Sequence, residues 1–555
     1  STKPIVTLHE LKKTTFSDHD SIRNTALDQE VVALDHSSQM QKRELRKVKA
    51  KAAKSQQFQS SVAQPHFAAL ATNHYSESEK YSASTHNQVQ SVNTQPVSTF
   101  SIDVDTASYS NVRRFLMNGH MPNVDAVRVE EMINYFNYDY PEAKDGQAFS
   151  LTTEMGPSPW HADKKLLHIG IQGKSIKAEQ RPHSNLVFLI DVSGSMHAAN
   201  KLGLLNPAMK MLVQQMNRED SISIVVYAGN SGTHLSPTSG ADKQKIIQAI
   251  DALSAGGSTH GSAGIQVAYA LAQEHFIKDG INRVMLATDG DFNVGTTNER
   301  SLKQLIEEKR QSGVSLSILG FGQGNYNDKL MQTLAQNGNG NAYYIDSLNE
   351  ARKVLVEDLS ATLMTIAKDV KIQIEFNPKL VSEYRLLGYE TRHLNRQDFN
   401  NDNVDAGEIG AGHTVTALYE VTLVNSKAKM IDDLRYQEKS SVNNAVNHQQ
   451  EIAFLRLRHK KPAANTSELQ ETVIKAAAIQ NDIHNTSDNF RFSAAVAAFA
   501  QLLRHDQSLT TMSWQQLIDL AQSAKGQDRL GYRSEFLQLL RLAQTLQPQS
   551  VAINR

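Results

Sequence analysis

The stretch NLVFLIDVSGSM, residues 185–196, joins an apolar run to a cluster of oxygen-bearing side chains. Its first half is almost continuously apolar, which is typical of a strand covered on both faces. Its second half places Asp191, Ser193 and Ser195 at alternate positions around Gly194, whose backbone permits a bend. A strand that simply ends needs only one or two turn residues, so three regularly spaced oxygen donors predict a ligand site.

Residues 184–366 continue the pattern that this stretch begins, because apolar runs alternate with amphipathic helical segments. The further strand candidates are ISIVVYA (222–228), RVMLATDG (283–290), SLSILGFG (315–322) and AYYID (342–346). This alternation predicts an α/β domain with a doubly wound, mostly parallel, Rossmann-like sheet and helices on both faces. Such sheets bind ligands at the carboxyl ends of their strands, where Asp191 and Asp289 both fall.

Three loops at this edge carry the candidate chemistry: DVSGSM (191–196), GGSTHG (256–261) and TDGDFN (288–293). Together they offer two carboxylates and three hydroxyls, from Asp191, Ser193, Ser195, Thr259 and Asp289. An all-oxygen set suits a hard divalent cation, above all Mg²⁺, with Ca²⁺ or Mn²⁺ as alternatives. The two carboxylates offset the charge of the ion, and one coordination position would remain for a carboxylate from outside.

These motifs resemble the metal-ion-dependent adhesion site of the von Willebrand factor A (VWA) family. The resemblance implies that Ser193, Ser195 and Thr259 coordinate the ion through their hydroxyls, while Asp191 and Asp289 act directly or through water. The residues flanking the site would form a rim that selects the partner, namely Met196, His197, His260, Asp291, Phe292 and Asn293.

The resemblance extends along the chain to a bacterial envelope family typified by YfbK. It is carried by NLVFLIDVSGSM, NRVMLATDGDFNVG, GFGQGNYND and YRLLGYETR, among other segments, over roughly residues 97–545. Members of that family often look like lipoproteins or secreted proteins. The resemblance therefore implies a location in the bacterial cell envelope, as a periplasmic, membrane-anchored or surface protein.

Changes in composition predict five regions. They are a polar extended arm (1–96), a flanking domain of helices and strands (97–183), the VWA domain (184–366), a β-rich domain that pairs with strands of 148–174 (367–465) and a helical region (466–555). The arm contains the basic run KRELRKVKAKAAK (42–54), for which a solvated helix face is the favoured interpretation.

Composition excludes several classes of function. The 555 residues carry a net charge of −1, which gives no electrostatic footprint for nucleic acid. There is no cysteine, so disulfides and thiolate chemistry are excluded. No apolar run approaches the ~20 residues of a membrane span. The sequence begins with serine rather than methionine, so we expect that something was removed from its start, and a missing leader would be the place for a lipid anchor.

The leading hypothesis is a non-enzymatic, Mg²⁺-dependent protein-binding module, in which an acidic residue of a protein partner completes the coordination of the ion. A turn and helix N-cap would explain DVSGSM if it stood alone. DVDTAS (103–108) offers a second alternative, a metal-dependent phosphoesterase with Asp103 as nucleophile and Asp105 as acid or base. The third is a structural protein that forms homo-oligomers through its arm.

Overall fold

The computed structural model describes residues 79–547, except 84, 103–104, 229–230, 258–260, 291–298, 325, 433, 436–449 and 510. Most of the predicted polar arm thus lies outside the described residues, and with it the proposed oligomer contact. Within the described part of the chain, no helix combines the length and apolar character needed to cross a membrane.

The α/β domain is built on a sheet that, among the described residues, has the strand order β10-β9-β8-β5-β6-β7. Its strands are β5 (Ser184–Asp191), β6 (Ser221–Tyr227), β7 (Ser231–Ser239), β8 (Ile281–Thr288), β9 (Ser315–Phe321) and β10 (Ala342–Ile345). Neighbouring strands are parallel, apart from β7, which pairs antiparallel with β6 at the edge. The predicted doubly wound, mostly parallel sheet is confirmed.

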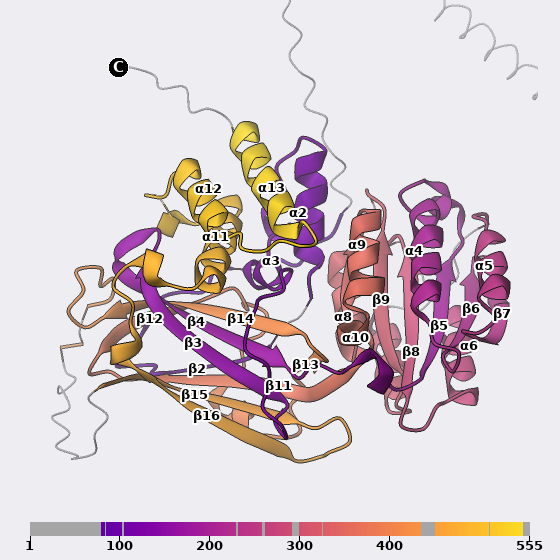
Figure 1. Cartoon of the computed structure of the whole chain (residues 1–555), viewed down its shortest axis with the longest axis horizontal. Coiled ribbons are helices and arrows are strands. Elements are labelled where there is room, and N and C mark those ends of the chain that lie inside the picture. Colours follow the sequence, from indigo (N-terminus) through magenta and orange to yellow (C-terminus); the bar gives the residue numbers. More distant parts are fainter. Residues whose placement is uncertain are drawn as a thin grey trace, which may run out of the picture. The chain divides into compact units, whose positions relative to one another are not determined.

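Helices cover both faces of this sheet (Figure 1). Leu186, Phe188 and Ile190 of β5 belong to one apolar cluster, whereas Val187 and Leu189 belong to the other. The first cluster also includes α4 (Leu202–Gln215), α5 (Lys243–Asp251), α9 (Leu348–Arg352) and α10 (Leu359–Leu363). The second includes α6 (Gly261–Glu274), α7 (Glu299–Arg310) and α8 (Asp328–Asn337). The uninterrupted apolar run of β5 is thus explained by burial on both sides.

Two further sheets share one apolar core and form a β-sandwich. One has the order β1-β12-β14-β4-β3, and the other has the order β13-β11-β15-β16 with β2 also on β11. The strands are β1 (Gln90–Ser91), β2 (Val97–Ser101), β3 (Phe149–Ser158), β4 (His161–Gly173), β11 (Thr365–Phe376), β12 (Val381–Leu387), β13 (Gly407–Gly410), β14 (Thr414–Leu423), β15 (Glu451–Lys460) and β16 (Ser467–Lys475). The chain leaves the sandwich after β4 and returns at β11, so the α/β domain is an insertion.

A helical cap covers one side of the sandwich. It consists of α2 (Ala107–Met117), α3 (Val129–Asn134), α11 (Asp488–Leu503), α12 (Trp514–Ser523) and α13 (Tyr532–Leu546). Phe136, Phe492 and Phe536 meet edge to face within this cap, with ring centroids 4.9–5.6 Å apart. Aromatic pairs of this geometry stabilise a core beyond the area they bury. The C-terminal helices therefore pack on helices from before the insertion.

Two stretches differ from the regions predicted by composition. Residues 79–96 were assigned to the arm, but Glu79 pairs with Arg114 and β1 pairs with β12, so they belong to the folded unit. Residues 467–475 were assigned to the helical region, but they form the edge strand β16. Leu469 and Val473 of β16 are 45% and 37% exposed, so the face of the strand that carries them is not buried.

Arg113 in α2 connects the helical cap to the α/β domain through three carboxylates. Its guanidinium pairs with Asp346, with Glu350 at 2.7 Å and with Glu535 of α13 at 2.9 Å. The side chains of Arg113 and Glu350 are 3% and 1% exposed. A buried charge is tolerated only when it is paired, so each of these groups depends on the others.

Replacing Arg113 with methionine should lower the free energy of unfolding by about 3–5 kcal/mol, because Glu350 would be left buried without its cation. The matched control is Arg310→Met, since Arg310 pairs with Asp405 at the surface and should contribute no more than about 1 kcal/mol. Urea unfolding of both variants checks this. Equal losses would contradict the role given to Arg113.

His168 of β4 joins the sandwich to the cap as a neutral imidazole. Its Nε2 lies 2.7 Å from the Tyr140 hydroxyl, and its Nδ1 lies 3.0 Å from the Ser493 hydroxyl of α11. Burial lowers the pKa of His168 to about 3. The folded protein therefore resists protonation at a site that the unfolded chain protonates near its ordinary pKa of about 6.5.

Because the pKa of His168 is lower in the folded state, its contribution to stability is complete above pH ~6.5 and declines as the pH falls toward 3. At pH 5 the loss should be about 2 kcal/mol. His168→Gln should be less stable at pH 7.5, but should lose about 2 kcal/mol less than wild type between pH 7.5 and 5. Urea unfolding at both pH values gives this difference, and an unchanged pH-dependent loss would disprove the assignment.

Candidate metal centre

The two predicted carboxylates come together because their strands are neighbours in the sheet. β5 and β8 are parallel, with Ile190 opposite Ala287, so Asp191 and Asp289 follow at the same edge. Both aspartates are fully buried. Two carboxylates that share a desolvated edge repel each other, and a cation between them would relieve that repulsion.

The loop after β5 is held in place by backbone hydrogen bonds to the loop before α6. The Gly194 N–H donates to the Gly257 carbonyl at 3.1 Å, and the Gly256 N–H donates to the Val192 carbonyl at 2.7 Å. These bonds bring GGSTHG against DVSGSM. Two of the three predicted loops are thus adjacent, although Thr259 itself lies outside the described residues.

Ser193 and Ser195 present their hydroxyls side by side. Their Oγ atoms are 2.9 Å apart, and the Ser193 N–H donates to Asp191 Oδ1 at 2.8 Å. Ser193 is 2% exposed, whereas Ser195 is exposed. The 3-10 turn at Gly194–His197 produces this arrangement directly after the strand. Alternate residues of the motif therefore offer neighbouring oxygen donors at the sheet edge.

Burial raises the pKa of Asp191 to about 6. Hydrogen bonds from Ser193 and from the Tyr227 hydroxyl oppose this shift, while the nearby Asp289 carboxylate adds to it. Beyond this interaction with Tyr227, the buried Asp191 Oδ2 atom accepts no hydrogen bond from the described residues. A buried carboxylate oxygen of this kind fits a cation ligand, because coordination would offset its desolvation.

Lys201 is a member of the site that sequence reasoning missed. Its Nζ lies 2.8 Å from Asp289 Oδ2, and the lysine residue is only 9% exposed. It precedes α4, ten positions after Asp191, where a lysine is normally interpreted as a solvated residue at a helix start. Only the neighbouring strand ends show that it points to the second carboxylate.

Comparison of the sequence with known proteins identifies the family of this chain. Family models match at residues 75–168 (von Willebrand factor), 185–358 (von Willebrand factor type A domain) and 361–546 (uncharacterized protein YfbK, C-terminal). The uncharacterized protein YfbK of Escherichia coli (strain K12) is 47% identical over 472 residues, which are 84% of this chain and 81% of that protein. The chain belongs to the YfbK family.

More distant relatives of this YfbK-family chain include human inter-alpha-trypsin inhibitor heavy chains. Heavy chain H4 is 30% identical over 146 residues, covering 25% of this chain and 16% of the relative. Heavy chain H3 is 28% identical over 172 residues, covering 29% and 19%. The solved von Willebrand factor type A structure from Catenulispora acidiphila covers 72% of the chain and 91% of its own, with 15% identity and a TM-score of 0.38.

The predicted rim is only partly described in this YfbK-family structure. His197 is exposed beside the serines, as a rim residue would be. Met196 was predicted for the rim but is fully buried in the core beneath α4, so it is not available to a partner. The apolar side chain at that position anchors the turn. The other rim residues, His260, Asp291, Phe292 and Asn293, lie outside the described residues.

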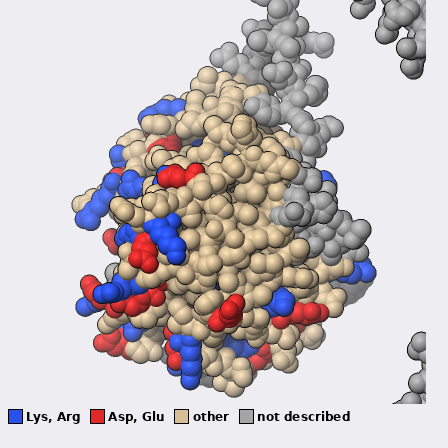
Figure 2. Space-filling model, turned by 90° about the vertical axis from the view of Figure 1, so that its right-hand side faces the viewer, with Lys and Arg blue, Asp and Glu red and all other residues tan. Residues whose placement is uncertain are grey.

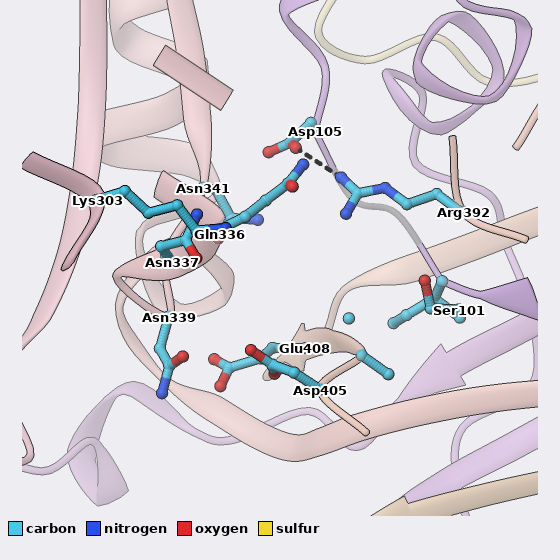
Figure 3. A pocket seen from close by; sticks show the side chains of 14 residues that line it. Ser101, Asp105, Lys303, Gln336, Asn337, Asn339, Asn341, Arg392, Asp405 and Glu408 are labelled. Carbon is cyan, nitrogen blue, oxygen red and sulfur yellow. Dashed lines mark hydrogen bonds and ion pairs between the residues drawn. The ribbon is translucent and has the colours of Figure 1, made fainter. Parts of the chain in front are cut away.

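Asp105 of the DVDTAS motif lies elsewhere, in a polar pocket of about 270 Å³ between the α/β domain and the sandwich (Figure 3). Asp105 accepts a hydrogen bond from the Ala342 N–H at 3.1 Å and pairs with Arg392 at 3.2 Å. Amide side chains of Gln336 and Asn341 also line the pocket. Asp105 is therefore a cross-domain anchor in this structure, and Asp103 lies outside the described residues.

Proposed function

We propose that this YfbK-family chain is a Mg²⁺-dependent, non-enzymatic protein-binding module, in which an Asp or Glu of a partner protein completes the coordination of the ion. The observation that carries the proposal is the pair of buried carboxylates, Asp191 and Asp289, beside two adjacent serine hydroxyls. A bound Mg²⁺ would supply a Lewis-acidic centre that attracts an outside carboxylate.

The donor set supports Mg²⁺ through its chemistry. Ser193 and Ser195 would hold the ion through hydroxyls, with Thr259 from the adjacent loop, while Asp191 and Asp289 would act directly or through water. Hard oxygen donors and retained water favour Mg²⁺, and Ca²⁺ or Mn²⁺ would also be accepted. Asp191 contributes an oxygen that is already removed from water in the folded protein. Binding of the ion therefore does not have to supply the free energy of desolvating it.

A protein partner is supported by the VWA domain and by the relation to the inter-alpha-trypsin inhibitor heavy chains. One carboxylate cannot specify a protein surface, so specificity would come from the rim, including the exposed His197. The face in Figure 2 carries basic and acidic side chains interspersed, without a patch of a single sign. The described residues of this face thus show no concentration of positive charge of the kind with which proteins bind nucleic acid.

The bacterial cell envelope is the proposed location. The Escherichia coli relative gives a bacterial setting, and a chain of 555 residues without cysteine suits an oxidising compartment. The partner would then be another envelope protein or a neighbouring copy of this chain.

Isothermal titration of the purified chain with Mg²⁺ tests the metal centre. Asp191→Asn keeps the size of the side chain but removes its charge, and should weaken Mg²⁺ binding by more than the roughly 10–100-fold typical of an outer-shell change. Asp251→Asn, a surface position in α5 of the same domain, is the control and should bind as wild type does. Unchanged binding by Asp191→Asn would reject the site.

The wild-type chain, used as bait on bacterial envelope extract, tests the partner. We expect a protein to be retained with Mg²⁺ and released by EDTA, and not to be retained by Asp191→Asn. If the same protein were retained with EDTA and by the Asp191→Asn variant, the proposed mode of binding would be overturned.

A further inference from the structure

Lys201 places a fixed positive charge inside the proposed metal centre. Its Nζ donates to Asp289 Oδ2 at 2.8 Å, and the Asp289 side chain is fully buried. The side chain of Lys201 is itself 11% exposed. A pair so far removed from solvent is weakly screened by salt, so its charges act strongly on anything that binds beside them.

The backbone of Lys201 is held firmly at the start of α4. Its N–H donates to the Ala198 carbonyl at 3.0 Å. Its carbonyl accepts from the N–H groups of Leu204 and Leu205 at 3.0 and 2.9 Å. The origin of the side chain is therefore fixed by the first turn of the helix.

Its aliphatic stem lies against Gly322, which follows β9. A methyl group at Gly322 would come within 2.3 Å of Lys201 Cε, so only glycine leaves room for the stem. Gly322 has φ +81°, and its carbonyl accepts a hydrogen bond from the buried Tyr344 hydroxyl. The glycine after β9 thus leaves room for the stem of Lys201, whose ammonium reaches Asp289.

The charge balance of the site depends on this lysine. Asp191 and Asp289 ionised, together with Lys201, give a net charge of −1, whereas the two aspartates alone would give −2. A divalent ion then brings these described charged groups to +1 with the lysine and to zero without it. A carboxylate from a partner would be attracted by the first arrangement and would meet no net charge in the second.

We propose that Lys201 is a built-in cation of the metal centre, which weakens binding of the divalent ion and strengthens binding of the acidic ligand. This inference rests on the proposed function. Because Lys201 competes for one oxygen of Asp289, it limits how tightly the ion is held. Because it keeps the metal-loaded site positive, it raises the affinity of that site for a carboxylate ligand while lowering its affinity for the ion.

The first test is titration of wild type, Lys201→Met and Lys201→Gln with Mg²⁺ and with Mn²⁺. Methionine keeps an unbranched stem beside Gly322, and glutamine keeps a polar end without charge. Both variants should bind either ion about tenfold more tightly than wild type, as expected for removal of one nearby charge in a partly buried site. Lys210→Met is the control, since Lys210 lies on the same helix but pairs at the surface with Asp251.

The outcomes separate the two proposals. If wild type binds the ion and Lys201→Met and Lys201→Gln bind it equally or less tightly, the lysine only joins α4 to the sheet edge, and the inference is overturned while the metal centre stands. If wild type binds neither ion at millimolar concentration, the proposed function is overturned and the inference with it.

The second test measures the carboxylate directly, with acetate as the probe. Mn²⁺ bound to the chain should broaden the methyl proton signal of acetate, because acetate reaches the ion. At saturating Mn²⁺, Lys201→Met should bind acetate about tenfold more weakly than wild type and Lys210→Met. Equal acetate affinities would overturn the inference even if the metal affinities differ.

Discussion

The parallel pairing of β5 with β8 is the constraint on which the candidate site depends. It brings Asp191 and Asp289 to one edge, although 98 positions separate them in the sequence. The apolar clusters on both faces of β5 fix its register, because a shift by one residue would exchange the sides on which Phe188 and Leu189 lie. The geometry of the site is thus determined by packing in the apolar core on both faces of β5.

Buried charge recurs through this YfbK-family structure, and several of the buried ion pairs connect segments that are distant in sequence. Arg113 joins α2 to Asp346 and α13, and Arg128 reaches Asp328 at the start of α8. Lys201 does the same at the candidate centre. Apolar surfaces can slide past one another at modest cost, whereas ion pairs in a desolvated setting cannot be broken without exposing a bare charge. Buried ion pairs therefore fix the position of the α/β domain on the cap as much as the packing of apolar surfaces does.

The sequence predicts the α/β domain well because its strands are apolar on both faces and its helices have a clear period. It also predicts Asp191, Ser193, Ser195 and Asp289, since a strand that ends in alternate oxygen donors is unusual. Strand β7 (SGTHLSPTS) was missed because an exposed edge strand needs few apolar residues. The position of Met196 and the role of Lys201 depend on neighbours far along the chain, which a local pattern does not contain.

The insertion of the α/β domain between β4 and β11 has a mechanical consequence. The polypeptide enters the domain after Gly173 and leaves it before Thr365, so two covalent segments attach it to the sandwich. A tension applied at the sheet edge by a tethered ligand would be divided between these two segments, each continuous with a long strand that is hydrogen-bonded in the sandwich. Pulling the α/β domain away from the sandwich would then stretch β4 and β11 along their length. In that shear geometry many hydrogen bonds must break together.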